Sequence, residues 1–154
     1  MVLDTFYKIV SAIFIAGVSS FITVFLSMRK FRTEKWWETR VSAYIDLIDS
    51  LHSLKEYSDV YLDEATEGRK VGDKEKKKLN ADYILAFSRV RRAANVGSLL
   101  FSASAHKEIS SCLNGLNAAT ETDHWPDHLV AHQEAMDGVI ERVVEISKLD
   151  LKLK

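Results

Sequence analysis

Three arginines near the middle of the chain carry the side chains best suited to binding phosphate. Arg89, Arg91 and Arg92 lie at the end of a predicted helix, just before Asn95 and Ser98. Guanidinium groups present forked donors that match phosphate oxygens. At about 100° per residue, Arg91 and Asn95 share one flank of the apolar face and would line the edge of a cleft. Arg92 points into solvent and Arg89 lies on the other flank. The alternative is that these cations only complement the helix dipole.

The segment after these arginines offers a second type of phosphate ligand. Ser98 and Ser104 lie between two predicted helices, and Lys107 follows in the first turn of the second helix. Amide groups at a helix amino end attract phosphates, and we expect that helix to begin near Ser104. Together with Arg91 and Asn95, this segment is the predicted site for a phosphorylated ligand. Ordinary capping by Ser104 is the alternative reading.

Lys55 is anomalous because a charge falls at the centre of an apolar helical stripe. Leu51 and Leu62 belong to that stripe, and His52 lies at its edge. A lysine in such a place snorkels, pairs with an acid, or faces a ligand or a subunit interface. We therefore predict His52 and Lys55 as a further anion site, with snorkelling or pairing as the alternative.

No pattern of residues predicts catalysis. His124, His128 and His132 repeat every four residues, but Pro126 starts a helix after the first of them, so a solvated face is favoured over a metal site. Walker A, GxGxxG, GxSxG and CxxC motifs are absent, and Cys112 lies in an apolar helix. We expect no enzyme, no cofactor and no metal ion.

The amino-terminal segment is the strongest signal in the sequence. Phe6–Met28 holds 23 residues with Lys8 as the only charge, and a bilayer core needs about 20 apolar residues as a helix. Four basic residues follow within seven positions, so the positive-inside rule places the amino terminus outside and the body in the cytosol. A cleaved signal peptide is the alternative, but its apolar region is only about 7–15 residues long.

Small residues follow one stripe of this predicted span. They are spaced three or four residues apart, which lets helix backbones approach one another and lets hydroxyls bond across the interface. The stripe consists of Ala12, Ala16, Ser20, Thr23 and Ser27. We predict self-association of the span along it; the alternative is that small residues are simply common in membrane helices.

A helical period dominates the rest of the chain, which carries no lasting strand-like alternation. The predicted fold class is all-α: one transmembrane helix, residues 1–30, continuing into a cytosolic bundle of about four helices, residues 31–154. The first bundle helix should bury Tyr44, Ile45, Leu51 and Leu54. The predicted helices cover about 37–61, 73–97, 104–119 and 126–149.

Charge is separated by segment although it nearly cancels overall. The 154 residues hold 21 basic and 22 acidic side chains, which argues against a general nucleic-acid coat and against a DNA duplex as partner. Residues 41–68 carry one basic and seven acidic residues, whereas residues 69–95 carry nine basic and three acidic ones. We expect the two segments to pair as an antiparallel hairpin, either simply attracting each other or leaving surplus basic charge for an anion.

Several short runs resemble a family of small bacterial membrane proteins. They are Glu34–Glu38 (EKWWE), Ala43–Tyr44, Ser50–His52 and Arg91–Gly97 (RRAANVG). The layout is also similar to that of single-span effectors of type III CRISPR systems. That resemblance implies a helical cytosolic domain that binds cyclic tetra-adenylate, a homo-oligomer such as a tetramer, and action at the bacterial inner membrane in antiphage defence. It assigns no ligand contacts to individual residues.

The resemblance, taken with the predicted span and phosphate site, therefore implies a membrane-anchored antiphage defence effector. Its cytosolic domain would bind a cyclic oligoadenylate, and its assembled spans would disrupt the lipid bilayer. The symmetric oligomer would supply the same few residues repeatedly to a ligand with several phosphates. The alternative is a membrane-tethered helical scaffold that docks a protein partner on the face marked by Lys55.

Overall fold

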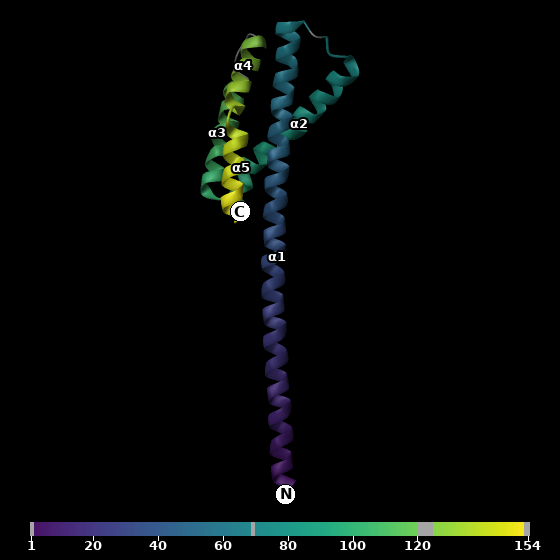
Figure 1. Cartoon of the computed structure of the whole chain (residues 1–154), viewed down its shortest axis with the longest axis vertical. Helices are drawn as coiled ribbons and strands as arrows, with labels where there is room; N and C mark the ends of the chain where they lie inside the picture. The colour runs from purple at the N-terminus through teal and green to yellow at the C-terminus, as the bar shows by residue number, and fades with distance from the viewer. Residues whose placement is uncertain (1, 69, 120–124, 153–154) are drawn as a thin grey trace. The chain divides into compact units, whose positions relative to one another are not determined.

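In the computed structural model, every regular element of the described residues is helical (Figure 1). The structure describes residues 2–68, 70–119 and 125–152, and the side chains from residue 19 onward apart from that of Trp125. The elements are α1 (Val2–Glu67), α2 (Asp73–Val96), the 3-10 helix η1 (Gly97–Leu99), α3 (Ala103–Ala119), α4 (Trp125–Met136) and α5 (Val139–Asp150).

The chain divides into two units, Met1–Glu38 and Thr39–Lys154, and α1 contributes to both. The predicted span Phe6–Met28 lies largely outside the residues whose side chains are described. Among those that are described, no helix has the length and apolar character needed to cross a membrane. Within the first unit, residues 19–38 are exposed, and ion pairs lie along the surface of this part of α1, such as Lys30–Glu34 at 3.7 Å.

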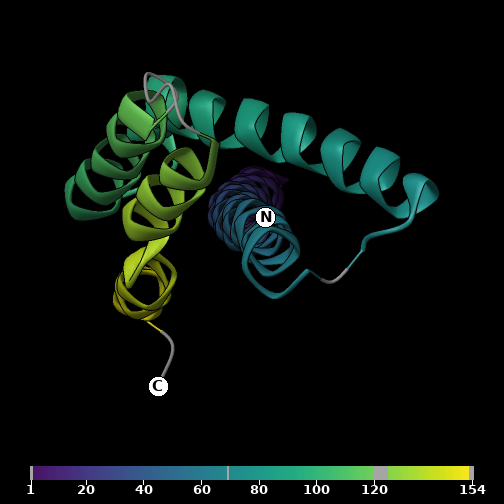
Figure 2. The same ribbon diagram turned by 90° about the horizontal axis from the view of Figure 1, so that it is seen from above.

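The core of the second unit, called here the helical domain, forms around one face of α1. Leu51 and Leu54 are fully buried there, among residues of α2, α3 and α5 such as Val90. Seen from above, α2 lies on one side of this part of α1, and α3, α4 and α5 lie on another (Figure 2). Because two sets of helices cover α1, its buried arc is broad and differs from the predicted stripe. Leu47 is 3% exposed, whereas Ile45, predicted to be buried, is 53% exposed.

The antiparallel pairing of α1 and α2 is confirmed by contacts whose residue numbers rise along one helix as they fall along the other. The Lys76 ammonium lies 2.7 Å from the Glu64 carboxylate. The Tyr57 and Tyr83 rings follow, with centroids 4.2 Å apart. The opposite charges of the two segments therefore meet at least once across the hairpin.

Two helix starts and one helix length differ from the prediction. α2 begins at Asp73 with Gly72 at the cap position, where Asp73 itself was expected. The first turn of α3 is capped by Ser102, whose hydroxyl accepts a hydrogen bond from the Ala105 amide at 3.3 Å, and not by Ser104.

The last predicted helix, 126–149, is divided into α4 and α5. Gly138 adopts φ 67° between them, a left-handed conformation that glycine reaches at little cost. The periodicity of the apolar residues continues across this break, so it did not reveal the division. The sequence allows either an extended link or a turn of helix between α2 and α3. The structure has a turn of helix there, η1.

Candidate functional site

A cleft of about 320 Å³ opens in the helical domain between α1 and the α2–η1 segment. The walls come from three parts of the chain that the hairpin brings together. The α1 wall is Ala43, Asp46 and Leu47; α2 supplies Arg89, Arg92, Ala93 and Val96; and Gly97, Leu100 and Phe101 complete it. We call this site the arginine cleft.

The lining of the arginine cleft combines two cations with apolar walls. Arg89 and Arg92 are exposed. Asp46 is the single carboxylate among the residues that line the cleft. Leu47 and Phe101 are buried and supply an apolar floor. Such a site suits a ligand with a phosphate and a flat apolar part. The forked guanidinium donors would bind the phosphate, and the flat part would cover the apolar floor and exclude water from it.

Gly97 allows the floor of the cleft to close. A methyl group added there would stand 2.7 Å from the Phe101 ring, nearer than real carbon contacts come. The Phe101 amide also donates to the Gly97 carbonyl oxygen at 2.7 Å. The position of the Phe101 ring thus depends on the absence of a side chain at Gly97, and a backbone hydrogen bond joins the same two residues.

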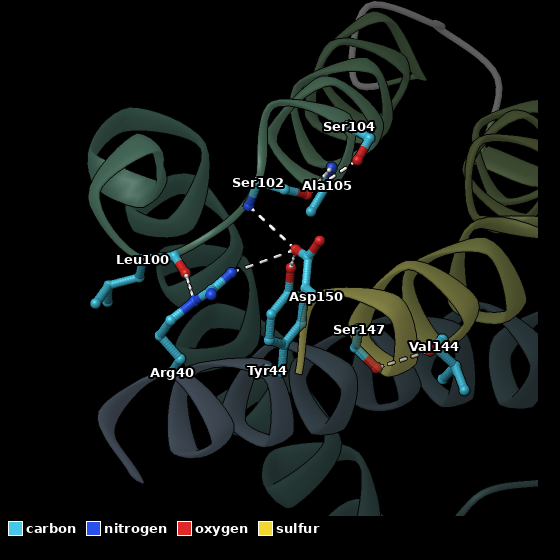
Figure 3. A network of polar contacts seen from close by, with 9 residues as sticks. All are labelled: Arg40, Tyr44, Leu100, Ser102, Ser104, Ala105, Val144, Ser147 and Asp150. Atoms are coloured by element: carbon cyan, nitrogen blue, oxygen red, sulfur yellow. Dashed lines mark hydrogen bonds and ion pairs between the residues drawn. The ribbon is translucent and has the colours of Figure 1, made fainter. Parts of the chain in front are cut away.

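A polar network around Asp150 anchors the wall of the cleft (Figure 3). The Arg40 Nε–H donates to the Leu100 carbonyl oxygen at 2.8 Å, and an Arg40 Nη lies 3.5 Å from the Asp150 carboxylate. The Tyr44 hydroxyl also donates to that carboxylate, as does the Ser102 amide at 3.2 Å. Asp150, in the last turn of α5, therefore ties α1 to the η1–α3 junction.

The titration of this network follows from its contacts. Burial alone would raise the pKa of the Asp150 carboxyl, but the hydrogen bonds from Tyr44 and Ser102 and the charge of Arg40 outweigh burial, so the pKa is lowered. Burial, together with the Asp150 charge, raises the pKa of Tyr44 to about 12. The carboxylate and the neutral phenol are thus both stabilised in the form that makes the bond.

The residues predicted for phosphate binding lie outside the arginine cleft. Arg91 is exposed on the other flank of α2, with its guanidinium 4.9 Å from the centre of the Phe87 ring. Asn95, Ser98, Ser104 and Lys107 are exposed as well, and none of them lines the cleft.

Arg91 was predicted to line the edge of a cleft, but the arginine cleft is lined by Arg89 and Arg92. A helical wheel measures how far each residue lies from the apolar stripe, but not which flank of that stripe meets the neighbouring helix. The flank that faces this part of α1 carries Arg89 and Arg92, so these two line the cleft in place of Arg91.

His52 and Lys55 line a different cleft, of about 510 Å³, between α1 and the junction of α4 and α5. Lys55 is half-buried and His52 is exposed. The charges beside them are mostly negative, which disfavours the anion site predicted for the pair. The acidic residues that line it are Glu56, Asp59, Asp137 and Glu141.

His132 was expected on a solvated face but is fully buried, with 0% exposure. Its ring contacts the Ser58 hydroxyl through Nδ1 at 2.5 Å and the Tyr83 hydroxyl through Nε2 at 3.4 Å. The Ser58 hydroxyl lies 3.3 Å from the Leu54 carbonyl oxygen. One direction of donation satisfies every atom: Tyr83 to Nε2, Nδ1–H to Ser58, and Ser58 to that carbonyl.

Burial and the neighbouring His128 lower the pKa of His132 to about 4. The ring is therefore neutral at physiological pH. The signal that sequence reasoning missed is its spacing from Leu129 and Met136, both buried, which places all three on one helical face.

The residues predicted for self-association of the span are described only in part. Ala12 and Ala16 lie outside the described side chains. Ser20, Thr23 and Ser27 are exposed, and the Thr23 hydroxyl donates to the Ser19 carbonyl oxygen at 2.8 Å. Among the residues that the structure describes, no group of three or more His, Cys, Asp or Glu is placed to hold a metal ion.

Comparison of the chain with protein-family models, with curated protein sequences and with solved structures finds no match.

Proposed function

We propose that the protein is a membrane-anchored antiphage defence effector whose helical domain binds a cyclic oligoadenylate in the arginine cleft. The observation that supports this is the pairing of Arg89 and Arg92 with the apolar surface of Leu47 and Phe101 in one cleft. A nucleotide carries the two complementary groups: a phosphate for the arginines and a flat base for the apolar surface.

The size of the cleft bears on how the ligand would be held. About 320 Å³ lies near the lower end of the ~300–1,000 Å³ of small-molecule sites. One cleft is suited to one nucleotide rather than to a ring of four. A ring such as cyclic tetra-adenylate would therefore be shared among copies, each binding one nucleotide, in a homo-oligomer with matching symmetry.

Binding has a route from the cleft to α1 inside the helical domain. Phe101 lines the cleft and packs edge-on against Tyr44, with ring centroids 4.9 Å apart. Arg40 holds the carbonyl of Leu100, the neighbouring cleft residue. A ligand that shifts Leu100 and Phe101 would therefore act on their α1 partners, Arg40 and Tyr44. The apolar segment Phe6–Met28 supports membrane anchorage of the same helix, where assembled spans would disrupt the bilayer.

Two neighbouring arginines provide the test. The full chain in detergent is titrated with cyclic tri-, tetra- and hexa-adenylate, with linear tetra-adenylate as the control ligand. We expect Arg92→Glu to weaken binding of the preferred ring by about a hundredfold, since it removes one charged hydrogen bond and adds repulsion. Arg91→Glu makes the same change of charge one residue away and should alter affinity by less than about threefold.

Three outcomes would count against this proposal. If no ring binds the full chain, the nucleotide function is wrong. If Arg91→Glu abolishes binding while Arg92→Glu does not, the ligand lies on the opposite flank of α2. If the linear nucleotide binds as tightly as any ring, the site does not select a cyclic messenger.

A further inference from the structure

The outer surface of α2 is both basic and apolar. Its lysines lie in the first turns, and two large aliphatic side chains follow on the same side of the helix. Ile84 is 68% exposed and Leu85 is 50% exposed, which is unusual for neighbouring residues of this size in a small domain. We call this surface the basic face: Lys74, Lys77, Lys78, Ala81, Ile84 and Leu85.

The cleft that contains Lys55 has the complementary character. Four carboxylates line it, and its apolar part comes from Val60, Met136 and Ile140. Glu56 and Glu141 are exposed at its rim, and the structure gives neither an ion pair among the described residues. We call this cleft the acidic groove.

One copy of the helical domain cannot bring these surfaces together. The opposite side of α2, with Leu79 and Ala86, is buried in the domain, so the basic face points outward. The acidic groove lies between α1 and the α4–α5 junction. Figure 2 shows α2 and α5 on different sides of this part of α1. The complementary charges are therefore available only to another molecule.

We propose that the helical domain self-associates head to tail, with the basic face of one copy in the acidic groove of the next. Lysines 77 and 78 would meet the carboxylates of the rim, while Ile84 and Leu85 would cover the apolar part of the groove. Opposite charges orient such an encounter, and apolar contact at its centre supplies the affinity. Because the two surfaces differ, each copy keeps one of each, and the contact closes into a ring or continues as a filament.

This contact depends neither on a nucleotide nor on the membrane span, so it is tested without either being assumed. The full chain is prepared in detergent with Ala81→Cys in one preparation and His52→Cys in another, and the two are mixed under mild oxidation. Both positions are exposed, and the native Cys112 is only 2% exposed. We expect a disulfide between unlike copies. Ala118→Cys, exposed on α3, replaces Ala81→Cys as the control and should cross-link about tenfold less.

Charge reversal then separates this contact from association through the spans. The pair Lys77→Glu and Lys78→Glu in the Ala81→Cys chain should lower the cross-linking yield about tenfold, because like charges then face each other. The pair Glu56→Lys and Glu141→Lys in the His52→Cys chain should restore the yield when the two are mixed, since the charges have been exchanged. A misfolded variant could not give this reciprocal rescue.

The proposal is overturned if the reversals leave the yield unchanged, if the exchanged charges fail to restore it, or if the control position cross-links equally well. Equal cross-linking of Ala118 would mean that the spans merely hold the domains near one another.

Discussion

Two hydrogen-bond networks join α1 to the carboxyl-terminal helices, and they differ in charge and burial. Near one end of the helical domain, Asp150 of α5 bonds as a carboxylate to Tyr44 and lies beside Arg40. Farther along α1, His132 of α4 bonds as a neutral ring to Ser58. The Asp150 side chain keeps 15% exposure, whereas His132 has none. Where water is fully excluded, a neutral network avoids the desolvation cost that a charge would incur.

The largest expected effect comes from removing the buried ring. His132→Ala leaves a cavity and removes the ring that contacts both the Ser58 and the Tyr83 hydroxyls, so we expect a loss of about 3–4 kcal/mol in the free energy of unfolding. Thermal and urea unfolding of the full chain in detergent, followed by circular dichroism, would measure it. His52→Ala, the same change at an exposed position, should cost less than about 0.5 kcal/mol. Equal effects of the two variants would contradict the assigned network.

Acidification should weaken the His132 network before the Asp150 network. The pKa of His132 is about 4 in the folded chain against an ordinary 6.5, so between these values the unfolded chain binds a proton that the folded chain does not. The free energy of unfolding should therefore fall by about 3 kcal/mol as the pH drops from 6.5 to 4. His132→Gln should remove most of this slope, and an unchanged slope would assign it to other groups.

Asp150 also contributes in its deprotonated form, but that form is charged, whereas the deprotonated form of His132 is neutral. Its pKa lies below the ordinary 3.8, so its stabilisation is present above that value and is lost as the pH falls through the lowered one. We expect Asp150→Asn to cost about 1–2 kcal/mol at neutral pH, less than His132→Ala, because the site is partly hydrated. Glu145→Gln, an exposed acid on the same helix, is the matched control. A larger effect for Asp150→Asn than for His132→Ala would reverse the comparison.

The smallest effect should come from Gly97→Ala, which disturbs only the Asp150 end. The new methyl group would displace the Phe101 ring, and that ring packs against Tyr44. We expect a loss of about 1 kcal/mol, partly offset by the better helix propensity of alanine. Nuclear magnetic resonance titration of His132 should give the same pKa in this variant; a changed value would show that the two networks are coupled.

The helices were predictable because their causes are local. Apolar periodicity and the glycines around residues 68–72 placed α2 at about 73–97, and the structure has Asp73–Val96. The division between α4 and α5 was not predicted, because Gly138 interrupts the backbone without interrupting the apolar pattern. The role of His132 was missed for a related reason: a histidine every fourth residue also fits an exposed face.

The candidate site was predictable only in kind. The chemistry of arginine and the position of the arginine group indicated a phosphate site near the end of α2. Which arginines line the cleft found there depends on the side from which α1 approaches α2, and this side brings in Arg89 and Arg92 but not Arg91. The surroundings of Lys55 depend in the same way on α4 and α5, which bring Asp137 and Glu141 beside it.

The sequence by itself determined the helical class of this protein, the approximate helix ends, the opposite charges of α1 and α2 and the long apolar amino-terminal segment. These follow from propensities and spacings within a few turns of chain. The tertiary structure alone decided which arginines meet in a cleft, that Asp150 binds Tyr44, and that His132 is buried. Each of these joins residues far apart in the sequence, and the packing of helices against one another, rather than any local preference, sets which side chains lose water and which partners they find.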